Sequence, residues 1–130
     1  MKGVLMFTWI DGNVNTLIAT LNPNSIILNQ KAASYFCDVR FVSVGLDSEK
    51  NLVAIHPVTK QELDLSIFTP QQLHKISIGN GYAKVSNTSL NTMIANQINR
   101  ELNNVKFNCY FDEKSKHLII DLNQEVKKEN

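Results

Sequence analysis

Apolar and polar residues alternate in short runs along this chain, and turn residues separate the runs. The alternation is clearest near the C-terminus, where Val105, Phe107, Cys109 and Phe111 alternate with more polar residues. A period of two is typical of a strand with one buried face. Similar apolar runs predict further strands at residues 4–10, 16–21, 25–28, 39–46, 52–55, 75–78, 82–85 and 118–122.

Two segments have the spacing of helices instead. Asn29 can cap a short helix that ends at Phe36, and Ser86 or Asn87 can cap a longer one. The longer helix has a continuous apolar stripe. The stripe consists of Leu90, Met93, Ile94, Ile98 and Leu102.

Turn residues complete this pattern of elements. Asn80-Gly81 separates two predicted strands and indicates a tight hairpin, because both residues accept positive φ. Thr69-Pro70 has the form of a helix start, with Thr as the cap and Pro in the first position.

The order strand, turn, strand, helix, strand, turn, strand occurs twice. Val39-Arg40-Phe41 is followed, eleven residues after the Phe, by Leu52-Val53, and Val105-Lys106-Phe107 is followed at the same interval by Leu118-Ile119. Upstream, residues 22–29 align with 80–87 without a gap. The offset is 58 in the upstream pair and 66 in the downstream pair. Self-similarity of this kind predicts a repeated architecture.

The pattern therefore predicts an α+β fold, an internal duplication of two ββαββ units with mostly antiparallel sheet and two core helices related by a pseudo-twofold. We expect a single domain over residues 1–130, with repeat one at about 4–55, a connector at 56–72, repeat two at about 73–122 and a flexible tail at 123–130. Because Phe41 and Phe107 are matched, both are predicted to be buried. Other duplicated folds of sheet and helix, including a saddle-like sheet, fit the pattern equally well.

Composition is typical of an ordinary globular protein. Among 130 residues, 43% are apolar, and thirteen Lys and Arg stand against twelve Asp and Glu, for a net charge of +1. This balance disfavours a strongly electrostatic nucleic-acid binder, but a local basic patch can exist within a neutral total.

Two features bear on compartment. Cys37 and Cys109 do not occupy equivalent places and form no CxxC pair, which predicts no disulfide, no zinc site and a reducing cytoplasm. The apolar residues 3–10 follow Lys2 as in a signal peptide, but Asp11 and the lack of a small-residue cleavage site favour a buried first strand. No window approaches the ~20 apolar residues of a membrane span, so no membrane partner is expected.

Candidate catalytic chemistry is sparse. No common catalytic or phosphate-binding motif is present, and no catalytic residue, cofactor or metal ligand is predicted. His56, His74 and His117 lack a His or Cys partner at the spacing of local metal sites, which favours solvated or capping roles. Cys109 is predicted to be a small core residue.

Four basic residues are the candidates for nucleic-acid contact. Arg40 matches Lys106 between the repeats, and Lys50 matches Lys116, so a pseudo-twofold would present them symmetrically to a duplex. Acidic residues crowd the same turns and would repel phosphate. They are Asp47, Glu49, Asp112 and Glu113. A solvated edge that discourages aggregation explains these charges as well.

Part of this pattern resembles a known family. Tyr82-Ala83-Lys84-Val85 leading to a helix, followed by Phe107 to Phe111, Asp112-Glu113-Lys114 and Leu118-Ile119-Ile120, resembles one module of the AbrB/MraZ swapped-hairpin family. Residues 25–28, 41–44 and 47–55 resemble the other module. The resemblance implies a two-module barrel that binds DNA through basic residues and regulates transcription. The chain lacks the family's Arg-rich face.

Two main hypotheses of function follow. The first is a small intracellular, non-catalytic binding or regulatory protein that acts through protein contacts, with a protein partner or through self-association. The alternative is an AbrB/MraZ-like DNA-binding transcription regulator. An enzyme whose site is assembled only by folding is a third hypothesis, which a large pocket with converging polar groups would favour.

Overall fold

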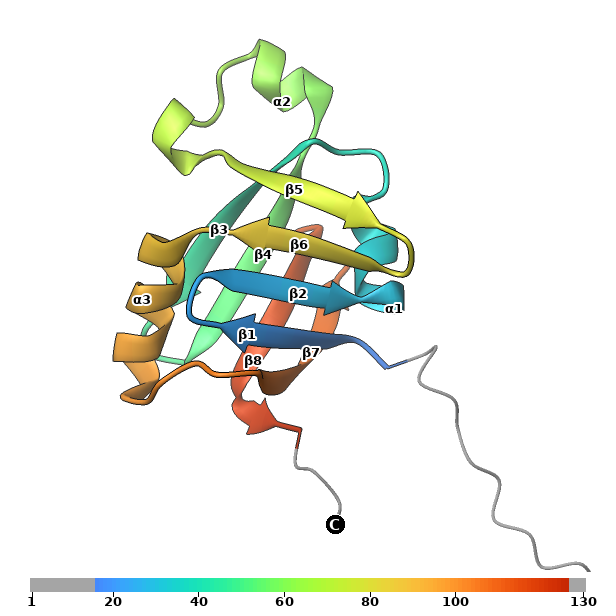
Figure 1. The fold of residues 1–130 in the computed structure, drawn as a ribbon. Helices are drawn as coiled ribbons and strands as arrows, with labels where there is room; N and C mark the ends of the chain where they lie inside the picture. Colours follow the sequence, from blue (N-terminus) through green and yellow to red (C-terminus); the bar gives the residue numbers. More distant parts are fainter. Residues whose placement is uncertain (1–15, 127–130) are drawn as a thin grey trace, which may run out of the picture.

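Eight strands form one closed barrel in the computed structural model, which describes residues 16–126 (Figure 1). Every neighbouring pair of strands is antiparallel. Around the barrel the order is β1-β2-β6-β5-β3-β4-β8-β7. The strands are β1 (Ile18–Asn22), β2 (Ser25–Asn29), β3 (Phe41–Asp47), β4 (Leu52–Val58), β5 (His74–Gly79), β6 (Tyr82–Ser86), β7 (Val105–Asp112) and β8 (His117–Glu125).

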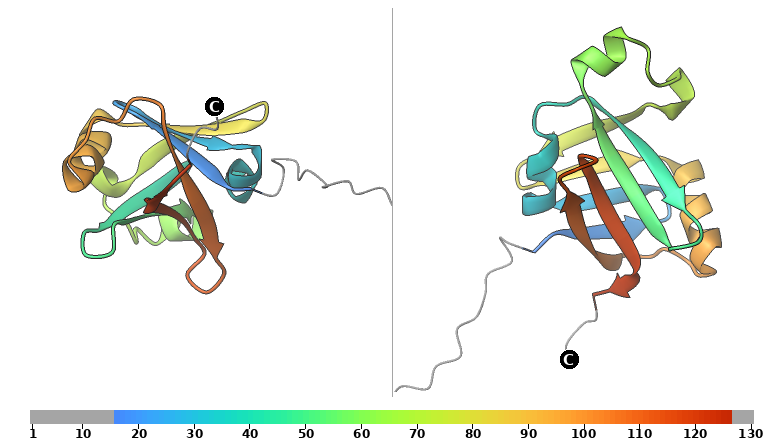
Figure 2. Two further views of the ribbon diagram at one scale, coloured as in Figure 1. Left: turned by 90° about the horizontal axis from the view of Figure 1, so that it is seen from below. Right: turned by 180° about the vertical axis from the view of Figure 1, so that it is seen from behind.

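The helices are short and lie outside the ring of strands. Figure 2 shows α1 and α3 at opposite ends of the barrel. The helical segments are α1 (Gln30–Ala33), continued by the 3-10 turn η2 (Ser34–Phe36), then α2 (Lys60–Asp64), the 3-10 turn η3 (Pro70–Gln72) and α3 (Thr88–Ile98). The predicted fold class, an α+β duplication of two ββαββ units around two core helices, is therefore wrong. The strands close on one another, so a single barrel interior replaces the predicted helix-filled core.

The individual elements, in contrast, were largely predictable. The Asn29 side chain accepts the hydrogen bond from the backbone N–H of Ala32 at 3.1 Å and caps α1. Asn87 caps α3 in the same way, through the N–H of Leu90 at 2.9 Å. Strand β8 continues to Glu125, so residues 123–125 of the predicted flexible tail are strand. The predicted strand at 4–10 and the end of that tail lie outside the described residues.

One contiguous core fills the barrel, and every strand contributes to it. Alternate side chains of each strand point inward, as a period of two requires. The ends of the core are covered by Phe36 of η2 and Ile94 of α3, both fully buried. The largest fully buried side chains are Phe36, Phe107, Leu21, Ile26, Leu28, Ile55, Ile94, Leu118, Ile120, Val42, Val53 and Val58.

The two longer hairpins, β3–β4 and β7–β8, correspond to each other with an offset of 65 residues, whereas the sequence pattern predicted an offset of 66. Asp47 pairs with Leu52 at the end of β3–β4, and Asp112 pairs with His117 at the end of β7–β8. The last turn residue has positive φ in both hairpins, 55° and 60°. A shift of one residue moves a side chain to the other face of a strand. Phe107 is therefore buried as predicted, whereas the prediction that Phe41 is buried is wrong: Phe41 is half-buried on the outer face, and Val42 points inward.

This difference in face predicts different costs of truncation. Phe107→Ala should lower the free energy of unfolding by ~3–5 kcal/mol, because it leaves a cavity in the core. Phe41→Ala should cost about 1–2 kcal/mol, because only part of the ring leaves water on folding. Urea denaturation measures both values. Equal losses would contradict the assigned register.

Candidate functional site

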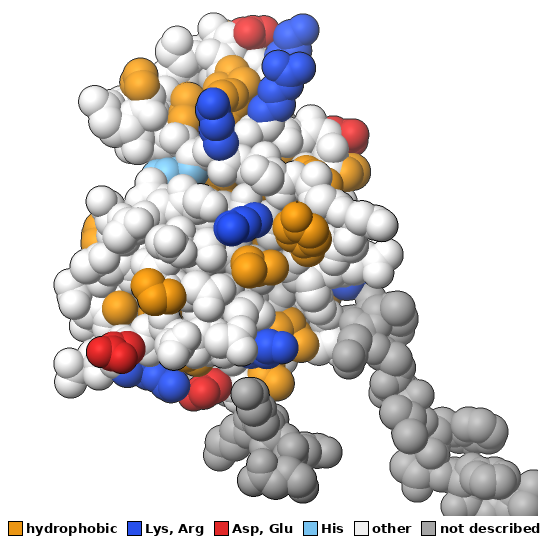
Figure 3. All heavy atoms as spheres, in the orientation of Figure 1, with side chains coloured by type: hydrophobic (Ala, Val, Ile, Leu, Met, Phe, Trp, Pro, Cys, Tyr) orange, Lys and Arg blue, Asp and Glu red, His pale blue; other side chains and the backbone are white. Residues whose placement is uncertain are grey.

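One side of the barrel carries cations and no acids. Strands β1, β2, β6 and β5 form this side (Figure 1) and contain neither Asp nor Glu. Lys75 of β5 and Lys84 of β6 are exposed there, and Lys106 is exposed at the start of the adjoining β7. Figure 3 shows blue Lys and Arg side chains across this side, with red Asp and Glu side chains only at its margins. The net charge of +1 therefore conceals an uneven distribution of acidic residues.

Strand pairing places two of these cations in one row. Lys106 pairs with Thr20, Thr20 with Ile27, and Ile27 with Lys84. Because neighbouring strands lie ~4.8 Å apart, three strand spacings separate Lys106 from Lys84 by roughly 14 Å. Lys75 is diagonal to Lys84 on the neighbouring strand, a separation of ~7–8 Å.

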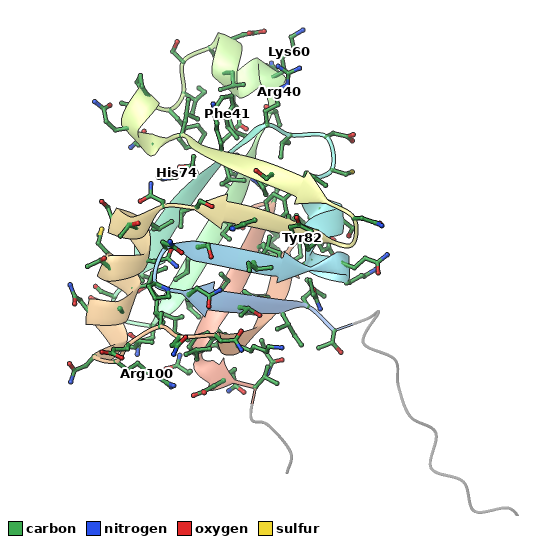
Figure 4. All side chains as sticks on the ribbon, in the orientation of Figure 1. Arg40, Phe41, Lys60, His74, Tyr82 and Arg100 are labelled. Atoms are coloured by element: carbon green, nitrogen blue, oxygen red, sulfur yellow. The ribbon has the colours of Figure 1, made fainter. Side chains whose placement is uncertain are left out.

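Two further cations extend the series toward α2. Arg40 immediately precedes β3, and its carbonyl oxygen accepts the N–H of Ile76 at 3.1 Å. Arg40 and Lys60, labelled in Figure 4, line one cleft of about 460 Å³, which Asp38 and Asp64 line as well. We call Arg40, Lys60, Lys75, Lys84 and Lys106 the basic face. Among residues 16–126, none of the five forms an ion pair with a carboxylate.

Tyr82 adds an aromatic surface beside these cations. Its side chain is 45% exposed, and Tyr82 pairs with Gly79 across the β5–β6 hairpin. A Cβ on Gly79 would collide with the Tyr82 ring, so the ring covers the glycine. An aromatic ring that covers a glycine in a neighbouring strand is a known way to stabilise a sheet. The ring is thereby held in position on the basic face.

The four residues predicted from the repeats are not all brought together. Arg40 and Lys106 belong to the basic face. Lys50 and Lys116 lie in the turns of β3–β4 and β7–β8, which project from the side of the barrel opposite β2 and β6 (Figure 2). Lys116 also forms an ion pair with Glu113, at 3.2 Å.

In these two turns carboxylates stand beside the lysines: the β3–β4 turn has two acids and one Lys, and the β7–β8 turn has two acids and two Lys. The Asp47 carboxylate accepts the N–H groups of Glu49 and Lys50, each at 3.1 Å. In the other turn, the Ser115 hydroxyl donates to Asp112 at 2.6 Å and is the main reason that the pKa of Asp112 lies below its usual value. The carboxylates of both turns oppose binding of phosphate.

A second polar cluster lies on the outer surface of β4 and β8. Both carboxylate oxygens of Glu62 lie within hydrogen-bonding distance of Nε2 of His56, at 3.0 and 2.9 Å. The His117 ring packs edge-on against His56 at 5.0 Å between centroids. The three residues line a cleft of about 480 Å³ together with Ser43 and others. The predicted solvated or capping role is therefore wrong for His56, which is held by Glu62.

Burial and neighbouring charge set the titration of this cluster. Partial burial raises the pKa of Glu62, but hydrogen bonds from Thr59 and His56 outweigh it, and the pKa lies below its usual value. Burial lowers the pKa of His117, and nearby His56 lowers it further, against the opposing attraction of Asp112 and Glu62. His117 is therefore neutral at pH 7.

This cluster lacks the arrangement of a catalytic dyad. Nδ1 of His56 is buried without a hydrogen-bond partner. In the described part of the chain, no Ser, Thr or Cys side chain is hydrogen-bonded to His56 or His117, so neither imidazole is poised to activate a nucleophile.

The other residues that the sequence singled out are His74, Cys37 and Cys109. Nδ1 of His74 accepts from the Asn87 amide at 3.1 Å, and burial lowers the pKa of His74. Cys37 and Cys109 are free thiols, in agreement with the sequence. Burial raises the pKa of the Cys109 thiol to about 12, so this thiol is unreactive at neutral pH.

Residues 16–126 contain neither a cluster of metal ligands nor a membrane-spanning helix. No group of three or more His, Cys, Asp and Glu side chains in this range could hold a metal ion. No helix in the same range is long and apolar enough to cross a membrane.

Comparisons with known proteins identify no relative. No family model, curated protein or solved structure matches the chain.

The histidines predict a pH dependence of stability. His74 and His117 resist protonation in the fold, whereas in the unfolded chain they take up a proton near pH 6.5. The unfolded state therefore binds more protons in this range, and the free energy of unfolding should fall as the pH drops from 7.5 to 5.5. Urea titrations at both pH values measure the change. The double variant His74→Gln, His117→Gln should reduce it, and an unaltered dependence would contradict the assignment.

Proposed function

We propose that the protein binds nucleic acid, with duplex DNA as its ligand, through the basic face. The observation that carries the proposal is that five exposed cations form no ion pair with a carboxylate and lie on or beside the acid-free strands β1, β2, β6 and β5. Lys75, Lys84 and Lys106 form its centre, whereas Arg40 and Lys60 lie at its margin near Asp38 and Asp64. A cation without a carboxylate partner can neutralise a phosphate and release a counterion.

The distribution of acids supports the same orientation. The turns that contain Asp47 and Asp112 lie on the opposite side of the barrel, where carboxylates offset the charge of the lysines. A duplex is therefore attracted mainly by the basic face. A neutral total charge does not oppose this, because charges beyond about 8 Å are screened at physiological salt.

The kind of contact follows from the shape of the face. Lys75, Lys84 and Lys106 stand on strands, and the helix that contains Lys60, α2, has only five residues. Lys side chains on such a surface contact phosphates, which position a protein on DNA but carry no sequence information directly. We therefore expect weak sequence preference and a strong dependence on salt.

The resemblance to the AbrB/MraZ family points to the same ligand, since basic residues around a barrel contact DNA in that family. A role as a transcription regulator follows from that resemblance alone.

The alternative function, recognition of a protein partner, has less support over the surface as a whole. The exposed large apolar side chains come from five separate parts of the structure, not from one patch. They are Leu65 and Ile67 after α2, Ile78 of β5, Tyr82 of β6, Met93 of α3 and Tyr110 of β7.

The decisive experiment compares two matched double variants. In fluorescence anisotropy with a 20-base-pair duplex, Lys84→Gln with Lys106→Gln should flatten the plot of log affinity against log salt by about two phosphate contacts. Lys50→Gln with Lys116→Gln removes the same charge from the opposite side and should leave the slope unchanged.

Two results would overturn the proposal. The first is the absence of duplex binding near 50 mM salt, where the electrostatic attraction is strongest. The second is an equal loss of slope in both double variants, which would mean that the basic face contributes no more to DNA binding than the opposite side. Tighter binding of a single strand of the same length would replace duplex DNA with single strands as the ligand.

A further inference from the structure

Strand β3 is paired along only part of one of its edges. All seven of its residues pair with β4, but only Phe41 and Val42 pair with β5. From Ser43 to Asp47, no other strand within residues 16–126 pairs with this edge. An unpaired edge presents N–H and C=O groups in a row and is a template for another strand.

An apolar slot runs beside this free edge, between β3 and α3. Its volume is about 300 Å³. Val44 and Leu46 line the slot from the strand, and Leu90, Met93 and Ile94 line it from the helix. Met93 is 59% exposed despite its apolar side chain. The slot can therefore take up apolar side chains.

The other face of the same stretch has a polar cleft. Val44 and Gly45 line both the slot and the cleft that contains His56, Glu62 and His117. No atom lies within 4 Å of the position of a Cβ on Gly45, so another backbone can approach closely. Side chains of an added strand alternate between two faces. They would enter the apolar slot and the polar cleft in turn.

Charges at the two ends of the free edge set a direction. The turn with Asp47, Glu49 and Lys50 lies at one end and has a net negative charge, and His74 and Lys75 of β5 lie at the other. A strand that runs antiparallel to β3 begins beside Asp47 and ends opposite Ser43, next to the start of β5 at His74 and Lys75. A cation at its start and an anion at its end would each face an opposite charge, which stabilises strand pairs.

We propose that the free edge of β3 binds an extended segment of a partner protein as an added antiparallel strand. The segment has Lys or Arg at its N-terminal end, apolar and uncharged polar residues in alternation, and Asp or Glu at its C-terminal end. A peptide backbone is the ligand whose N–H and C=O groups match those of the edge. This site has Lys75 in common with the basic face but not Lys84 or Lys106, so the variants that test DNA binding leave it intact.

The test uses a labelled, end-capped peptide, Arg-Ile-Thr-Val-Thr-Glu, titrated with the full chain and followed by anisotropy. We expect saturable binding. The charge-swapped peptide Glu-Ile-Thr-Val-Thr-Arg should bind several-fold more weakly. Of two peptides N-methylated at Val or at the preceding Thr, only one should lose binding, because N–H groups alternate between the two sides of a strand.

A matched pair of variants locates the site. Met93→Glu places a charge in the slot and should weaken peptide binding by about tenfold or more. Asn96→Glu adds the same charge at another exposed position of α3 and should leave binding unchanged. Both positions are exposed, so both variants should fold, which circular dichroism checks.

Three outcomes would overturn the proposal. In the first, the peptide does not bind. In the second, both N-methylated peptides bind as well as the parent peptide, which excludes a strand ladder. In the third outcome, the amides on the free edge of residues 43–47 resist hydrogen exchange without any peptide, and this protection changes with protein concentration or when residues 1–15 are deleted. That result would assign the edge to a second copy or to another segment of this chain.

Discussion

The antiparallel pairing of β2 with β6 holds together two parts of the barrel that are more than 50 residues apart in the chain. Five residue pairs, from Ser25 with Ser86 to Asn29 with Tyr82, join the β1–β2 hairpin to the β5–β6 hairpin. On the inner face this register packs Ile26 and Leu28 beside Val85 and Ala83, which are fully buried. On the outer face the same register aligns Ile27 with Lys84. The core and the basic face thus depend on one set of backbone hydrogen bonds.

Sequence patterns predicted the local elements because their causes are local. Period-two alternation marked β7, the Asn80-Gly81 turn marked a hairpin, and Asn29 and Asn87 marked helix starts. Closure of the barrel was not predictable in the same way, because it depends on pairings between distant hairpins that local propensity does not encode. The alignment of repeats failed by one residue, which is enough to turn Phe41 outward.

The candidate site was only partly predictable for related reasons. Matching the repeats selected Arg40 and Lys106 but also Lys50 and Lys116, which the fold separates. A stronger signal for the basic face is the absence of Asp and Glu from residues 12–37 and 65–100. Folding places most of these two stretches together, and Lys75 and Lys84 then stand on an acid-free surface. The contact of His56 with Glu62 had a weaker signal, the capping box at Thr59 that fixes the Glu62 side chain.

The closed barrel and the basic face both depend on the ring of strand pairs. Nuclear Overhauser effects in the unmodified protein test these pairings most directly. Backbone protons of Ile27 and Lys84, and those of Ala54 and Ile119, face one another across the two pairings that join hairpins distant in sequence. We predict cross-peaks for both pairs, together with slow amide exchange in β2, β4, β6 and β8. Cross-peaks within the hairpins alone, with none between β2 and β6, would contradict the closed barrel and the basic face that depends on it.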